Sequence, residues 1–248
     1  MKIHRTVDRA ISMLEIISNH PEGVSLNEIS EMMEIPKSSC FDILHTLVST
    51  QMIEPIGREG KIYRIGIRAF VIGNQYLSSK KLMEIAQTQI EHIGDRFEKS
   101  VFLAEDSFDK VVYVYKYQPK DIAVVASCTV GTKMEYYNTA LGKCMLAFKD
   151  NFVELIDKAY EQGVISDKER LILEVIDIRK KKYVFSDQEH QKQLFCIASP
   201  IFDHRGTVVS ALSMSGLYST DERRDLERDV IHAAAEEISR EIGYIGEY

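Results

Sequence analysis

A short polar face is the first pattern in this chain that could carry chemistry. Over residues 37–47, Cys40, Ile43, Leu44 and Leu47 fall at i, i+3, i+4 and i+7, which predicts a helix with one apolar stripe. The opposite face is small and polar, and its donors and acceptors suit the base edges of a DNA major groove. Its side chains are Lys37, Ser38, Ser39, Asp42, His45 and Thr46. An ordinary helix pair in a small bundle would give the same pattern.

The elements around this helix favour the DNA-binding interpretation. The preceding helix is predicted over residues 26–33, where Ser25-x-x-Glu28 forms a capping box and Pro36 follows a break. The remaining elements are a helix over residues 7–17 and strands over residues 53–56 and 61–65, around a loop at 57–60. Three helices followed by a small basic hairpin are typical of a winged helix-turn-helix.

Basic residues occur in this unit where DNA phosphates would lie, and such contacts supply affinity while the polar helix meets base edges. Asp42 lies on the reading face, where it either accepts from a cytosine amino group or caps and pairs locally. The residues predicted to contact DNA are Arg5, Arg9, Lys37, Ser38, Ser39, Phe41, Asp42, His45, Arg58, Lys61 and Arg64.

Composition limits the other classes of protein. The chain has 248 residues, 45% of them hydrophobic, and a formal net charge of −7, so any DNA affinity must come from a local basic patch. No apolar run reaches the length of a membrane span, and the N-terminal residues lack a signal-peptide core, so we expect a cytoplasmic protein. The four cysteines show no metal-ligand spacing, which predicts free thiols and no metal or cofactor.

A second domain of the α+β class is predicted after two connecting helices. Strands with turns between them come first, then three helices, a hairpin and a long charged helix. The connecting helices are expected at 68–79 and 82–97; the strands at 101–105, 110–117, 122–127, 194–202 and 207–215; and the later helices at 139–148, capped by Asn138, and at 152–160, 167–181 and 221–242.

Five motifs in this order resemble the IclR family of bacterial transcription regulators, over nearly the whole chain. They are Thr6-Val7-Asp8-Arg9-Ala10, Ile35-Pro36-Lys37-Ser38-Ser39, Gly60-Lys61-Ile62-Tyr63-Arg64-Ile65-Gly66, the run 138–147 (NTALGKCMLA) after Gly131, and Cys196-Ile197-Ala198-Ser199-Pro200-Ile201-Phe202-Asp203 with 211–216 (ALSMSG). Two departures stand out: Asp42 replaces a common arginine of the recognition helix, and residues 191–195 lack a usual glycine.

The resemblance implies a winged helix-turn-helix over residues 1–66, a linker helix over 67–82 and a GAF-like effector-binding domain over 83–248. It also implies a homodimer or homotetramer that binds operator DNA as a repressor or activator, with a repressor as the first expectation. The effector would be a small metabolite, of the organic or aromatic acid class.

The residues themselves also indicate an effector site. The helix start at 138–142 offers backbone N–H groups that suit an anion, and Ser213 and Ser215 alternate on one face of a strand. Packing of small residues and hydrogen bonds between strands would explain the same features. The predicted effector-binding residues are Met134, Thr139, Ala140, Leu141, Gly142, Asp187, Cys196, Ser213 and Ser215, of which Asp187 rests on the resemblance.

Two other classes of protein remain as alternatives. One is a thiol-dependent enzyme with a GAF-like domain, using Cys144 or Cys196 with His190 or His204 and Asp187. Neither cysteine has a base near it in the sequence, so we expect no catalytic residues and no enzyme. The other is an architectural DNA-binding protein without a ligand, for which the second domain is larger than dimerisation requires.

Overall fold

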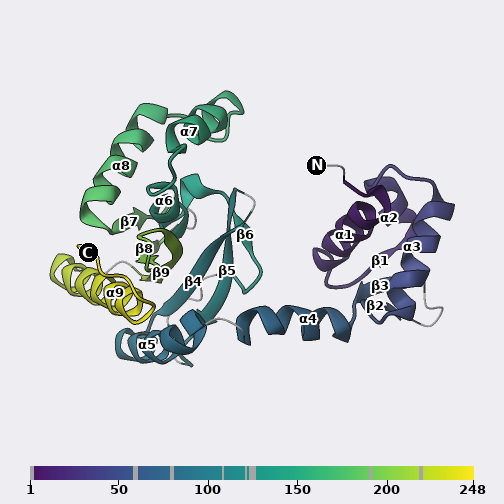
Figure 1. Cartoon of the computed structure of the whole chain (residues 1–248), viewed down its shortest axis with the longest axis horizontal. Coiled ribbons are helices and arrows are strands. Elements are labelled where there is room, and N and C mark those ends of the chain that lie inside the picture. Colours follow the sequence, from purple (N-terminus) through teal and green to yellow (C-terminus); the bar gives the residue numbers. More distant parts are fainter. Residues whose placement is uncertain are drawn as a thin grey trace. The chain divides into compact units, whose positions relative to one another are not determined.

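The structure, a computed structural model, describes residues 3–57, 61–78, 81–107, 109–120, 122, 127–189, 192–217 and 220–248. The chain forms two compact units, Met1–Lys80 and Lys81–Tyr248 (Figure 1). No described helix is both long and apolar enough to cross a membrane.

The first unit packs helices on a small three-stranded sheet of order β1-β3-β2. Its elements are α1 (Arg5–Ser18), β1 (Val24–Ser25), α2 (Leu26–Met32), α3 (Lys37–Ser49), β2 (Ile53–Ile56), β3 (Ile62–Ile65) and α4 (Ile67–Ser78). The predicted capping box of α2 is present, because Ser25 and Glu28 each bond the backbone N–H of the other. The chain leaves α2 through Glu34, at a left-handed φ of 52°, and Pro36 precedes α3.

The apolar stripe of α3 explains why its polar face is available. Cys40, Ile43, Leu44 and Leu47 are all buried in the core of this unit, together with residues of α1, α2 and β2. The predicted winged helix-turn-helix is therefore confirmed. The sequence did not predict β1, a two-residue strand that pairs Val24 with Tyr63.

The second unit is built on a six-stranded antiparallel sheet of order β6-β5-β4-β9-β8-β7. Its strands are β4 (Ser100–Ser107), β5 (Lys110–Tyr117), β6 (Lys133–Met134), β7 (Val184–Asp187), β8 (Leu194–Phe202) and β9 (Val208–Leu217). Its helices are α5 (Lys81–Phe97), the 3₁₀ turn η1 (Tyr136–Asn138), α6 (Ala140–Leu146), α7 (Phe152–Glu161), α8 (Lys168–Lys181) and α9 (Asp221–Glu241). Helices α5 and α9 pack on one face, and α6 packs on the other with α8 and α7 behind it (Figure 1).

This arrangement confirms the α+β class, although some elements differ from the predicted ones. Thr139, not Asn138, caps α6, because the Thr139 Oγ1 accepts from the Gly142 N–H at 3.0 Å while Asn138 ends η1. Strands β6 and β7 were not predicted. The strand expected at 122–127 lies almost wholly outside the described residues.

The register of the sheet brings residues from four strands into two neighbouring rows that include several polar side chains. Opposite residues in a ladder share a face. Cys196 pairs with Ser186 on β7 and with Ser215 on β9. In the next row, Ser213 lies between Ala198 and Phe102. Both rows face α6 and form the floor beneath its N-terminus.

A buried ion pair ties the start of the sheet to α9 on the opposite face. The Lys99 Nζ lies 2.7 Å from both carboxylate oxygens of Glu227, and both side chains are buried. Burial lowers the pKa of Lys99, so the ammonium depends on this partner. Removing one member of such a pair leaves the other charge without compensation.

We predict that Glu227→Ala destabilises the second unit by about 3–5 kcal/mol, as expected when a buried ion pair loses one partner. Urea denaturation followed by circular dichroism measures the change. The control is Asp229→Ala, which removes an exposed partner of Arg228 on the same helix and should cost about 1 kcal/mol or less. Equal losses for the two variants would contradict the importance of the buried pair.

Candidate functional site

Helix α3 presents its polar face to solvent. Lys37, Ser38, Phe41, Asp42 and His45 are exposed, and Ser39 is half-buried. The Phe41 side chain is 54% exposed, and its ring centre lies 6.2 Å from that of His45, one turn further along. A large apolar ring on a polar reading face suits contact with a thymine methyl group.

Asp42 makes no local side-chain contact that would explain its position. Its backbone carbonyl accepts from the Thr46 Oγ1 at 2.9 Å, but its carboxylate has no hydrogen bond or ion pair within the described part of the chain. Of the two interpretations of Asp42, the structure therefore gives no support to local capping or pairing.

The basic residues predicted to meet phosphates differ in their surroundings. Arg5, Lys61 and Arg64 are exposed, and Arg9 is half-buried. Arg64 lies opposite Glu54 in the β2–β3 ladder, and its Nε is 2.6 Å from the Glu54 carboxylate, so part of its charge is compensated. Arg58 lies outside the described residues.

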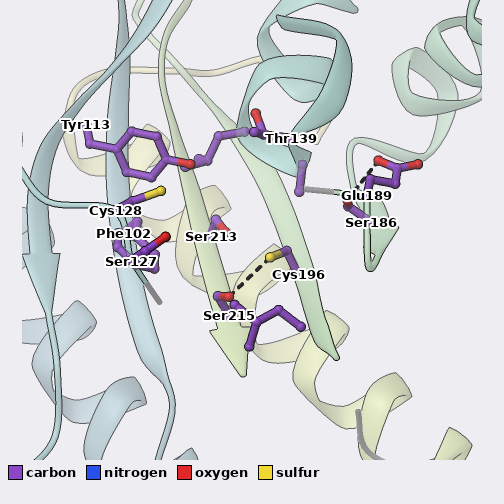
Figure 2. Close-up of a pocket in the computed structure, with 13 residues that line it drawn as sticks. Phe102, Tyr113, Ser127, Cys128, Thr139, Ser186, Glu189, Cys196, Ser213 and Ser215 are labelled. Carbon is purple, nitrogen blue, oxygen red and sulfur yellow. Dashed lines mark hydrogen bonds between the residues drawn. The ribbon is translucent and has the colours of Figure 1, made fainter. Parts of the chain in front are cut away.

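A cavity lies between the N-terminus of α6 and the two polar rows of the sheet (Figure 2). It holds about 480 Å³ of space that no atom fills, part of it open to solvent. The lining comprises Phe102, Tyr113, Ser127, Cys128, Thr139, Ala140, Leu141, Ser186, Glu189, Leu194, Cys196, Ser213 and Ser215. Apolar walls with a few polar groups are typical of small-molecule sites.

The structure brings most of the predicted effector residues to this cavity. Its lining includes Thr139, Ala140, Leu141, Cys196, Ser213 and Ser215 from the predicted set. Met134, Gly142 and Asp187 do not line it. A Cβ on Gly142 would lie 2.5 Å from the Tyr136 carbonyl oxygen, so this glycine allows close packing of protein backbone rather than of a ligand. Asp187 is exposed at the end of β7, next to the lining residue Ser186.

Sequence reasoning missed the lining residues outside the predicted motifs. Phe102 and Tyr113 belong to the β-rich runs of β4 and β5, where nothing but register distinguishes cavity residues from core residues. Ser186 lies opposite Cys196, so recognition of β7 would have placed it. Glu189 follows β7 in a segment without a secondary-structure pattern.

Hydroxyl groups provide much of the polarity of the cavity. The Thr139 Oγ1 accepts from Gly142, which leaves its own proton for a ligand. The Cys196 thiol donates to the Ser215 Oγ at 3.2 Å. Ser213 is 3% exposed and has no hydrogen-bond partner among the described residues, although it lines the cavity. A hydroxyl that lines a cavity without a protein partner can bond a ligand or water there.

An acidic side chain lies at one corner of the cavity, opposite Tyr113 and Cys128 in Figure 2. The Glu189 Oε1 accepts from the Lys143 Nζ at 2.6 Å, and its Oε2 accepts from the Ser186 Oγ at 2.8 Å. Lys143 is only 3% exposed and also contacts both oxygens of Glu174, at 2.8 and 3.0 Å. Its charge is therefore shared between two carboxylates.

The thiols in and behind the cavity wall are protonated at neutral pH. Burial raises the pKa of Cys196 to about 11, and burial also raises the pKa of Cys128 and of the fully enclosed Cys144. A nucleophilic cysteine needs the opposite shift. The described residues also hold no group of histidine, cysteine, aspartate or glutamate side chains suited to a metal ion.

Comparison with known proteins identifies the class and then the family. The model described as "IclR helix-turn-helix domain" matches residues 6–56, and the model described as "Bacterial transcriptional regulator IclR C-terminal" matches residues 74–240. The fold and these matches define a transcription regulator with a DNA-binding domain and an effector-binding domain. The chain belongs to the IclR family.

Individual relatives and solved structures agree with this assignment. The "Transcriptional repressor IclR" of Escherichia coli (strain K12) is 25% identical, over 96% of this chain and 90% of that protein. The structure of an IclR transcriptional regulator from Alicyclobacillus acidocaldarius has a TM-score of 0.85 at 22% identity, covering 98% of this chain and 100% of that chain. An IclR homolog from Microbacterium hydrocarbonoxydans, complexed with 4-hydroxybenzoate, has a TM-score of 0.81 at 20% identity, covering 96% and 98%.

We predict that Cys196 of the folded protein reacts slowly with iodoacetamide and that its rate rises with pH up to about pH 10. With a pKa of about 11, about one part in a thousand is thiolate at pH 8, against about a quarter for an ordinary cysteine. Peptide mass spectrometry after timed alkylation measures the rate, with the urea-unfolded protein as control. Rapid alkylation of the folded protein at pH 7.5 would contradict a protonated thiol.

Proposed function

We propose that this regulator reads its operator with the exposed face of α3 and changes its affinity when a small organic acid occupies the cavity beneath α6. The hydroxyl of Ser213, a residue that is 3% exposed and lines the cavity without a described protein partner, is the observation that carries the ligand part of the proposal. The cysteines then serve as lining and core, and the protein is not an enzyme. Its place of action is the cytoplasm, where operator DNA is found.

The proposed effector contacts follow from the cavity. Hydroxyl protons of Thr139, Ser213 and Ser215 donate to a carboxylate, while Phe102 and Leu194 pack against its apolar part. The Microbacterium structure, which holds 4-hydroxybenzoate, supports an aromatic acid as one member of the class. A ligand that binds one arrangement of the protein better than another shifts the population towards it, and operator affinity follows.

We propose further that the functional unit is a homodimer and that two such dimers can associate into a tetramer. Exposed apolar residues Ile3, Val7 and Ile11 recur every four positions in and just before α1. Helix α4 exposes Phe70 and Val71 in the same unit, each more than half accessible. Apolar surface of this kind favours association, and a two-fold dimer matches a DNA site with two half-sites.

The direct test is a titration of the protein onto labelled DNA from upstream of its gene, followed by fluorescence anisotropy over a salt series. We expect tight binding that weakens steeply with salt and exceeds binding to scrambled DNA.

Lys37→Ala should weaken binding to all sequences and flatten the salt dependence. Asp42→Asn should instead change the preferred sequence, at a cost of about 1–3 kcal/mol on the original site. An unchanged sequence preference for Asp42→Asn would remove Asp42 from the reading face, and no binding to any DNA at low salt would contradict the proposed function.

For the dimer, we predict that Ile11→Glu halves the molar mass measured by light scattering, from that of a dimer to that of a monomer or from that of a tetramer to that of a dimer. A charge placed in an apolar contact costs its desolvation, so the contact is lost. Val153→Glu, at an exposed apolar position of α7, is the control and should leave the mass unchanged. A wild-type protein that is monomeric at micromolar concentration would contradict the proposal.

A further inference from the structure

The charge of the cavity lining is negative, whereas a site that binds any organic acid would be expected to carry positive charge. Glu189 is the one charged side chain among the described lining residues, and it is negative. Two lysines with other partners, Lys99 and Lys116, do not line the cavity. The Lys99 Nζ is held by Glu227, and the Lys116 Nζ lies 5.6 Å from the ring centre of Phe102.

The contacts of Glu189 hold its carboxylate in place and leave some of its hydrogen-bond acceptor positions free. Lys143 and Ser186 each donate to one oxygen, whereas an ionised carboxylate has about four lone-pair positions. The single charge of Lys143 faces the two carboxylates of Glu174 and Glu189, so this cluster carries a net negative charge. The corner can therefore accept further hydrogen bonds, but it repels an anion.

A second feature, separate from this cluster, indicates that a ligand completes the cavity. Ser213 is almost fully buried on β9 and has no described protein partner, and Ser215 and Thr139 each keep a hydroxyl proton for a ligand. The cavity thus has neutral donors along the sheet and α6, and an anionic acceptor at the corner formed by Ser186 and Glu189 (Figure 2).

From this arrangement we infer that Glu189 is a specificity-determining residue of the effector site. It accepts a hydrogen bond from a hydroxyl or ammonium group of the ligand and excludes a second carboxylate. The effector class that fits is a monocarboxylic acid with a hydrogen-bond donor at its far end. This inference rests on the proposed function, since it assumes that the cavity is the effector site.

The test uses two matched sets of three compounds with the full-length protein. The aromatic set is benzoate, 4-hydroxybenzoate and terephthalate, and the aliphatic set is pentanoate, 5-hydroxypentanoate and glutarate. Thermal shift and isothermal titration calorimetry measure binding. In at least one set, the hydroxy acid should bind at least about tenfold more tightly than the plain acid, because a hydrogen bond to a charged acceptor is worth that much or more. The diacid of that set should not bind.

Glu189→Gln separates the role of this side chain from general effects of charge. It keeps an acceptor but removes the negative charge, so binding of the diacid should become measurable while the advantage of the hydroxy acid shrinks. Glu174→Gln is the control. It also removes one negative charge from beside Lys143, but Glu174 does not line the cavity. It should leave the order of the three compounds unchanged.

Several results would overturn the inference. They are binding of a diacid to the wild-type protein, equal binding of plain and hydroxy acids, the same response in both variants, or no binding of any of the six compounds. Titration of the same preparation onto operator DNA distinguishes failure of this inference from failure of the proposed function. Intact DNA binding with any of these results refutes the role of Glu189 alone, whereas loss of DNA binding refutes the proposed function.

Discussion

The register of the antiparallel ladder through β7, β8, β9 and β4 is the constraint on which the rest of the second unit depends. Because side chains alternate between the two faces of a strand, this register places Ser213 and Ser215 beneath α6 while Leu212 and Met214 face the helices on the other side. A slip of one residue would exchange the two sets and replace the hydroxyl floor with core side chains. Burial of both faces therefore fixes the polar floor of the cavity as firmly as it fixes the core.

The chemistry of the cavity follows from what that floor can offer. Buried thiols and hydroxyls are neutral at physiological pH, so they direct a ligand by donating and accepting hydrogen bonds, without fixed charge. The fixed charge lies at one corner, on Glu189, where a buried lysine holds it in place. A ligand is thus oriented by the neutral hydroxyl groups at one end of the cavity and the charged Glu189 at the other. In this account, that difference in charge determines which ligands bind.

Local patterns allowed much of the fold to be predicted, because they depend on neighbours in the sequence. The stripe of α3 and the capping box of α2 are set within one or two turns, and β8 has the bounds that its apolar run predicted. Features that depend on distant partners were missed. Strand β7 is only four residues long, and Glu189 acquires its place through contacts with Lys143. Gly142 was predicted to contact the effector, whereas in the structure its missing Cβ makes room for the Tyr136 backbone.

The central claim is that occupancy of the cavity and binding of the operator are coupled, and linkage gives it a direct test. A compound that stabilises the protein thermally would be titrated calorimetrically into the free protein and into the protein–operator complex, and the operator affinity would be measured with and without it. Coupling requires the two affinity ratios to be equal and to differ from one, since linkage is reciprocal, and factors of about 5–150 are typical. Equal ligand affinity for the free and the DNA-bound protein would contradict the account.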